Sequence, residues 1–203
     1  MGQRQAAADK THERILAAAR KLLLAKNFSD FTMEAVARAA DVSRLTVYYQ
    51  FDSKTGLLEA LYNYVARRGN MQQLAEVFHQ GGDPVRMLHD FMLVFAQFWA
   101  SDREVIRRLH ALGAIDDEIG EGLRARNERR RRGLLVILER YSNVYHPLTP
   151  PQVANAIDTL HMLTSFETFD ALTGSGREFE EVVEIIRKQV HHAIGFMPRF
   201  VPR

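Results

Sequence analysis

The sequence predicts an all-α protein with a three-helix N-terminal domain (residues 1–55) and a six-helix C-terminal domain (residues 56–203). Three observations support this prediction. Apolar residues recur at helical spacing along most of the 203 residues. Strand-like alternation of apolar and polar residues is absent. The breaks between the apolar patterns carry residues that begin or end helices, such as serine, threonine, glycine and proline.

The composition is that of a globular protein with a sizeable core, at 46% hydrophobic and 26% charged residues. The chain has no cysteine, which excludes disulfides, thiolate zinc sites and cysteine catalysis. No run approaches the roughly 18 apolar residues that would suggest a membrane span. The polar first residues lack the apolar region of a signal peptide. We therefore expect a cytoplasmic protein without a membrane partner.

Residues 32–54 carry the most specific pattern in the chain. Two short helical patterns, residues 32–40 and 44–51, are joined by the polar turn Asp41-Val42-Ser43. Two short helices around a turn of three or four residues form a helix-turn-helix, whose second helix enters the DNA major groove. The pattern therefore predicts that double-stranded DNA is a partner.

The residues of the second short helix suit this role. Ser43 can cap the helix, and Arg44 at its start can donate a bidentate pair of hydrogen bonds to guanine. Leu45 and the methyl group of Thr46 suit contact with a thymine methyl. Taken singly, each residue could be a solvated or core side chain; together, at this spacing, they indicate DNA binding. Donors placed for phosphate oxygens, which fix register without reading sequence, are Thr46, Tyr49 and Lys54.

A longer pattern surrounds this motif: RILAAARKLLLAKNFSDFTMEAVARAADVS, followed by TVYYQFDSKTGLL. Over about the first sixty residues the chain resembles the TetR family of bacterial transcriptional regulators. The resemblance implies that the following residues touch DNA: Thr32, Arg44, Leu45, Thr46, Tyr48, Tyr49 and Lys54.

Three positions depart from the family pattern, which usually has glycine where this chain has Asn27, Asp41 and Leu45. Asparagine and aspartate tolerate a left-handed backbone, so we expect Asn27 and Asp41 to replace a turn glycine at modest cost. Leu45 instead adds an apolar side chain to the face that meets the groove.

Helix signals continue beyond the motif. We expect a long helix over residues 54–79 that ends at Gly81-Gly82, and a helix from Asp83-Pro84 to about residue 100. Ser101-x-x-Glu104 predicts a capping box for a helix to about residue 112.

The remaining helices are expected over residues 121–142, 149–172 and 177–194. The second of these begins at the capping box Thr149-Pro-Pro-Gln152, and Gly176 lies in the break that follows it. Nine helices in total match the architecture that the resemblance implies.

The last two expected helices are apolar on more than one face, which suits both inward packing and contact with a second copy. The resemblance implies a homodimer formed through these helices, and a twofold dimer would bind a palindromic operator. A monomer with well-buried helices is the alternative.

The middle of the chain could enclose a cavity with adaptable apolar walls. Phe91, Phe95 and Trp99, spaced by four residues, share a helix face. Aromatic residues at this spacing are also typical of an ordinary core, and both interpretations stay open. The candidate ligand-binding residues are Phe91, Met92, Phe95, Trp99, His110, Met162, Phe166 and Phe169.

An arginine-rich run lies between residues 124 and 132. The favoured interpretation is a solvated helix surface. The alternative is a site for an acidic ligand, because Arg126 and Arg130 share a helix face.

The sequence contains no HExxH, no phosphate-binding glycine loop and no G-x-S-x-G motif. We therefore expect no enzyme, no metal site and no cofactor. The resulting hypothesis is a ligand-responsive dimeric repressor released by a small, largely apolar effector. The alternatives are an architectural DNA-binding protein without an effector and a TetR-type activator.

Overall fold

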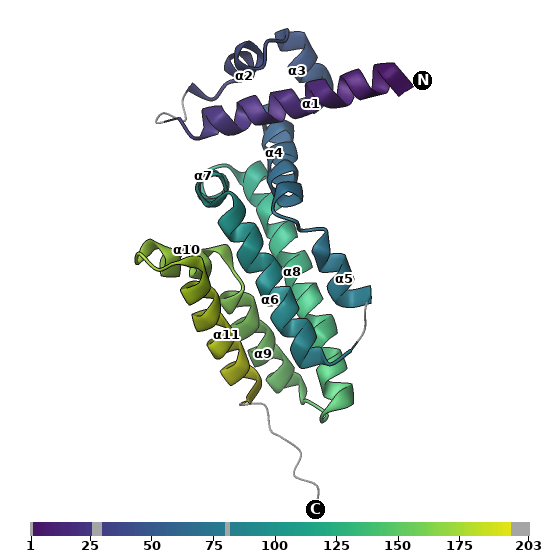
Figure 1. Cartoon of the computed structure of the whole chain (residues 1–203), viewed down its shortest axis with the longest axis vertical. Helices are drawn as coiled ribbons and strands as arrows, with labels where there is room; N and C mark the ends of the chain where they lie inside the picture. Colours follow the sequence, from purple (N-terminus) through teal and green to yellow (C-terminus); the bar gives the residue numbers. More distant parts are fainter. Residues whose placement is uncertain (1, 26–29, 80–81, 196–203) are drawn as a thin grey trace, which may run out of the picture. The chain divides into compact units, whose positions relative to one another are not determined.

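The computed structural model describes residues 2–25, 30–79 and 82–195. These residues form eleven helices and no strand, which confirms the predicted all-α class (Figure 1). Their bounds are α1 (Gly2–Leu23), α2 (Met33–Ala39), α3 (Arg44–Phe51), α4 (Lys54–Arg68), α5 (Gln73–His79), α6 (Pro84–Ser101), α7 (Arg103–Gly113), α8 (Asp117–Val144), α9 (Pro150–Leu163), α10 (Phe166–Gly174) and α11 (Phe179–Gly195). None of the described helices is long and apolar enough to cross a membrane.

The chain divides into two compact units that do not follow the order of the sequence. The headpiece unit comprises the residues up to Ala66 together with Asp102–Leu123, so it contains α1 to α3, most of α4, α7 and the start of α8. The body unit comprises Arg67–Ser101 together with the residues from Arg124 onward. The boundary after residue 55 stays a prediction, because a division by compactness does not locate the limit of a DNA-binding domain.

The headpiece unit has a continuous apolar core. α1 packs against α2 and α7, and α2 packs against α3. The core side chains recur at helical spacing on each element, so each helix buries one stripe. Fully buried members of this core are Ile15, Leu16, Ala19, Val36, Val47, Leu57, Leu61, Val105 and Ile106.

The expected long helix over residues 54–79 is wrong, because α4 ends at Arg68 and α5 begins at Gln73. Gly69 follows α4 at a point where a Cβ atom would lie only 2.9 Å from Cδ2 of Phe98. Asn70 then adopts a left-handed backbone with φ of 57°, which asparagine tolerates. The break therefore depends on a close approach to α6 and on a single turn residue.

The expected helix over residues 149–172 is also interrupted. α9 ends at Leu163, and Ser165 caps α10 by accepting a hydrogen bond from the Thr168 backbone N–H at 3.1 Å. The Thr164 carbonyl accepts instead from Trp99 Nε1 at 3.0 Å and from Arg130 Nη1 at 2.9 Å. Side chains from two other helices thus satisfy a carbonyl that the broken helix cannot.

The two predicted capping boxes have different outcomes. At the start of α9, the Gln152 side-chain oxygen accepts from the Thr149 backbone N–H at 2.8 Å, as predicted. The box at Ser101 and Glu104 is wrong: Asp102 is the N-cap residue of α7, and its carboxylate makes no capping hydrogen bond. That carboxylate accepts from Arg20 Nε at 2.5 Å and Nη2 at 2.8 Å.

Other predicted starts and turns have mixed outcomes. α8 begins at Asp117, before the expected residue 121, because Asp116 Oδ1 accepts from the Ile119 N–H at 3.1 Å. Gly176 has a positive φ of 79°, in agreement with the predicted break. Gly81 and Asn27 lie outside the described residues.

Candidate functional site

α2 and α3 form a helix-turn-helix whose short helices are capped at both starts. Thr32 Oγ1 accepts from the Ala35 backbone N–H at 3.1 Å, and Ser43 Oγ accepts from the Thr46 N–H at 3.0 Å. Asp41 has φ of 50°, which confirms the predicted left-handed turn residue. Each cap satisfies a backbone group that has no partner within the helix, so the turn and both helix starts are defined by local bonds.

The two faces of α3 differ sharply in exposure. Val47 and Phe51 are buried. Leu45 is 78% exposed and Tyr49 is 90% exposed, and Tyr48 is also exposed. Large apolar groups that gather on one solvent-facing surface indicate an interaction site. The exposed face of α3 is therefore the candidate nucleic-acid interface.

Arg44 lies at the start of α3 on this exposed side. Its guanidinium carbon is 5.3 Å from the centroid of the Tyr48 ring, and Nη2 donates to the Tyr48 hydroxyl at 3.5 Å. The hydrogen bond to Tyr48 raises the pKa of Arg44. Tyr48 thus lies against Arg44, the residue that we predicted from the sequence to recognise guanine.

The remaining predicted DNA-contacting residues border the same motif. Lys54 is exposed at the start of α4, with its ammonium 5.6 Å from the centroid of the Phe31 ring. The Thr46 hydroxyl lies 2.8 Å from the Ser43 hydroxyl. Thr32 is exposed but its side-chain oxygen already caps α2. The structure brings all seven predicted residues to α3 or to the helix starts beside it.

Two residues of α1 contact the motif, although no sequence pattern selected them. His12 Nδ1 lies 3.0 Å from Gln50 Oε1, and the His12 ring stacks on Phe51 at a centroid distance of 4.7 Å. Arg14 Nε donates to the Ala40 carbonyl at 3.0 Å. These partners lie 38 and 26 residues away in sequence, so only the fold could reveal them.

The predicted ligand-binding aromatics form a packed cluster in the body unit. Phe91 and Phe95 have ring centroids 4.8 Å apart, Phe95 and Trp99 are 5.8 Å apart, and Trp99 meets Phe166 edge-on at 5.6 Å. Such pairs stabilise a core beyond the area that they bury. The buried members of the predicted set are Phe91, Met92, Phe95, Trp99, Phe166 and Phe169.

Two predicted ligand residues lie elsewhere. Met162 is 57% exposed on α9. His110 lies on α7, which belongs to the headpiece unit. Helical spacing placed Met162 on the face of Phe166, but α9 ends at Leu163, so the two residues belong to different helices.

Arg130 is only 4% exposed, so the expectation of a solvated arginine surface is wrong at this position. Its guanidinium carbon lies 5.7 Å from the Phe95 ring centroid and 6.0 Å from that of Trp99. Nη2 also contacts His161 Nε2 at 2.9 Å. A guanidinium can only donate, so a hydrogen bond here uses Nε2 of a neutral His161 ring as acceptor. The same Nε2 also lies 3.2 Å from the Asn127 carbonyl, which can only accept.

The neutral state of His161 is favoured by its surroundings. Burial lowers the pKa of His161, and the positive charge of Arg130 lowers it further. Burial likewise lowers the pKa of His89 on α6, with contributions from Arg187 and His191. Protonation of either ring therefore costs more in the folded chain than in the unfolded chain.

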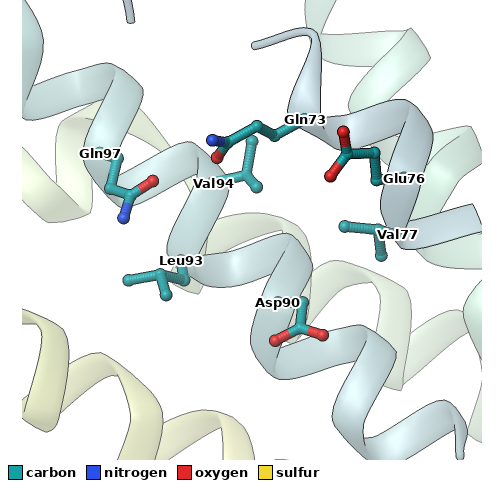
Figure 2. A pocket seen from close by; sticks show the side chains of 7 residues that line it. All are labelled: Gln73, Glu76, Val77, Asp90, Leu93, Val94 and Gln97. Atoms are coloured by element: carbon teal, nitrogen blue, oxygen red, sulfur yellow. The ribbon is translucent and has the colours of Figure 1, made fainter. Parts of the chain in front are cut away.

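A cleft of about 280 Å³ lies between α5 and α6 in the body unit (Figure 2). Its apolar walls come from Val77, Leu93 and Val94, while Glu76 of α5 and Asp90 of α6 place carboxylates beside them. The other lining residues are Gln73 and Gln97. None of the eight predicted ligand-binding residues lines this cleft. No basic residue is among these lining residues, but Arg86 Nε lies 3.8 Å from Asp90 Oδ2. The lining suits a ligand with an apolar body and a positive charge, which would compete with Arg86 for the Asp90 carboxylate.

Within the described part of the chain, no group of three or more histidine, aspartate or glutamate residues could hold a metal ion.

Comparison with known proteins matches the helix-turn-helix and its flanking helices to a protein family. The model of bacterial regulatory proteins of the tetR family matches residues 15–61, which span α2, α3 and the adjoining parts of α1 and α4. Residues 15–61 therefore resemble the helix-turn-helix segment of tetR-family regulators. The HTH-type transcriptional regulator YvkB of Bacillus subtilis is 37% identical over 67 residues, which cover 32% of this chain and 35% of YvkB. The chain spans about a third of the length of the curated relatives that it matches.

Solved structures extend the similarity through the tetR fold as a whole. NalD of Pseudomonas aeruginosa, the secondary repressor of the MexAB-OprM multidrug efflux pump, has a TM-score of 0.68 at 24% identity, over 92% of this chain and 96% of NalD. A regulator from Saccharomonospora viridis in complex with choline has a TM-score of 0.66 at 15% identity, over 91% and 97% of the two chains. At these identities the similarity shows the fold.

Substitution of the α3 cap tests the local geometry of this tetR-family motif. Ser43→Ala removes the acceptor of the Thr46 N–H and should lower the free energy of unfolding by about 0.5–2 kcal/mol. Urea unfolding monitored by circular dichroism measures the change. An unchanged midpoint would show that the Ser43 hydroxyl does not stabilise the start of α3.

The buried histidines predict how stability depends on pH. Because the folded-state pKa values of His161 and His89 are lowered, the unfolded chain binds more protons near pH 6. The free energy of unfolding should therefore fall as pH falls through the ordinary histidine pKa of 6.5. His161→Gln keeps an acceptor for Arg130 and should make this dependence shallower in a urea-unfolding series from pH 8 to 5. An unaltered pH profile would contradict the assignment to His161.

Proposed function

We propose that the protein is a dimeric transcriptional repressor that binds a palindromic operator and is released by a small, largely apolar effector. The exposed face of α3 carries this proposal. A capped helix that begins with Arg44 and leaves Leu45 and Tyr49 almost fully in solvent has the chemistry of a recognition helix. The cytoplasm, where duplex DNA is accessible, is the proposed location.

The residues of the motif divide into two roles. Arg44 donates to the O6 and N7 acceptors of guanine, and Leu45 contacts a thymine methyl, so these two residues read sequence. The other five residues hold the protein on the backbone through phosphate oxygens. These backbone contacts are assigned to Thr32, Thr46, Tyr48, Tyr49 and Lys54.

The dimer is proposed to form through α9, α10 and α11, the segments that correspond to the last two expected helices. Met162 leaves an apolar side chain exposed on α9, and Ile185 is partly exposed on α11. A twofold axis would place two recognition helices about 34–36 Å apart, the distance between successive major-groove faces. An effector that favours another spacing would weaken DNA binding by the difference in its affinity for the two states.

The cleft between α5 and α6 is the proposed effector site, and its lining residues indicate which kind of effector would bind. Val77 and Leu93 suit an apolar body, while Glu76 and Asp90 favour a positively charged group. Choline, which is bound by the regulator from Saccharomonospora viridis, is a cation of this kind. The aromatic cluster around Phe95 is proposed as the core that supports this region.

Selection from a random duplex library tests the proposed function. The wild-type protein should enrich a palindrome at near-physiological salt. Arg44→Ala should cost about 1–3 kcal/mol and relax the choice at one base pair of each half-site. Salt-sensitive binding without an enriched sequence would favour an architectural DNA-binding protein.

The backbone role of Lys54 predicts a different signature. Lys54→Gln removes one exposed cation and should weaken binding to all duplexes alike. It should also reduce the slope of log K against log salt by about 1. Titrations of the palindrome and of a scrambled duplex at several salt concentrations measure both effects, and a loss confined to the palindrome would refute the backbone assignment.

Paired ligands test the charge preference of the cleft. Choline should bind the protein in calorimetry, whereas its neutral analogue 3,3-dimethyl-1-butanol should bind more weakly, because only choline carries the charge. Asp90→Asn should reduce choline binding, and Glu128→Gln, an exposed carboxylate on α8, serves as the matched control. Equal binding of both ligands, or no effect of Asp90→Asn, would exclude a cation site in this cleft.

A further inference from the structure

Two side chains of α1 contact the helix-turn-helix near the two ends of the recognition helix. Before its start, Arg14 Nε donates to the Ala40 carbonyl at 3.0 Å and Nη2 donates to the Asp41 carbonyl at 2.9 Å. At its end, His12 stacks on Phe51 and lies within hydrogen-bond distance of Gln50. Ala40 and Asp41 form the turn before α3, whereas Gln50 and Phe51 are its last two residues.

The bonds of Arg14 act on the least regular part of the motif. Ala40 is the C-cap residue of α2, and Asp41 has a left-handed backbone. Carbonyls at a helix end have no partner within the helix. A guanidinium presents its N–H groups in a fixed fork, so donation to two successive carbonyls restrains their relative orientation.

This restraint bears directly on base recognition. Ser43, the cap of α3, lies two residues after Asp41, and Arg44 follows at once. A rotation of the turn would move the start of α3, where Arg44 must meet a guanine edge with bidentate geometry. Contacts to phosphate carry no sequence information. Such a movement should therefore affect discrimination between sequences more than affinity for the DNA backbone.

We propose that Arg14 and His12 are positioning residues for sequence readout, which hold the start and the end of the recognition helix without touching a base. This inference rests on the proposed DNA-binding function. It assigns to the two side chains a role in discrimination between sequences, and it excludes a phosphate contact as the main role of Arg14.

Three variants in the full-length protein separate these roles. Arg14→Lys keeps the charge but loses the fork, Arg14→Gln removes both, and Lys10→Gln removes an exposed cation from the same helix as a matched control. Fluorescence anisotropy measures their affinities for the selected palindrome and for a scrambled duplex between 50 and 200 mM salt. Arg14→Lys should lose about tenfold on the palindrome, as expected for hydrogen bonds to a charged group. Its affinity for the scrambled duplex and its salt slope should be those of the wild type.

Hydrogen exchange supplies a second measurement. Amides of residues 42–46 should exchange faster in Arg14→Lys, while those of the buried segment around Leu57 and Leu61 should not change. His12→Ala, which leaves the bonds to Ala40 and Asp41 in place, should show the same preferential loss on the palindrome. This variant decides the question if the Arg14 variants fail to fold.

The opposing outcomes are distinct. Wild-type affinity of Arg14→Lys or of His12→Ala for the palindrome would overturn the proposal. Equal losses on both duplexes in Arg14→Gln, with a salt slope reduced by about 1 and wild-type behaviour of Arg14→Lys, would assign Arg14 to a phosphate. If the wild-type protein itself selects no palindrome, the proposed function fails instead.

Discussion

The need to satisfy backbone groups at helix ends is the constraint on which this architecture depends. Each helix leaves up to four amides and four carbonyls without a partner of its own, and the described chain has eleven helices. Long side chains from distant segments supply several of the missing partners. Arg108 donates to the Leu23 and Ala25 carbonyls at the end of α1 and just beyond it. Arg14 donates to the turn after α2, and Trp99 donates to the Thr164 carbonyl after α9.

This constraint explains why α3 can expose so much apolar surface. Its own caps and the contacts from α1 hold the helix in place, and only Val47 and Phe51 need to be buried. Leu45 and Tyr49 are then free of a structural role and available to a partner. The support of α3 therefore lies in α1, α2 and the turn, whereas its proposed recognition chemistry lies on the exposed face.

In the body unit, the buried guanidinium of Arg130 also satisfies a carbonyl at a helix end. Removal of a guanidinium from water is costly unless hydrogen bonds and nearby π-systems compensate. Arg130 donates to the Thr164 carbonyl, lies 2.9 Å from His161 Nε2, and is close to the rings of Phe95 and Trp99. The predicted ligand-binding aromatics thus pack beside the break between α9 and α10. The open cleft lies between α5 and α6 and is lined by none of the predicted ligand-binding residues.

Local signals in the sequence determined the all-α class, the helix-turn-helix, the caps at Ser43 and Thr149 and the left-handed turn at Asp41, because these features depend on residues a few positions apart. The tertiary structure alone decided the breaks after Arg68 and Leu163, since close approach to Phe98 and the hydrogen bonds of Trp99 and Arg130 come from distant helices. It also decided which arginine is buried, where Met162 and His110 lie, and which α1 residues touch the recognition helix. Helical spacing defines the face of a helix, but only packing determines which neighbour that face meets.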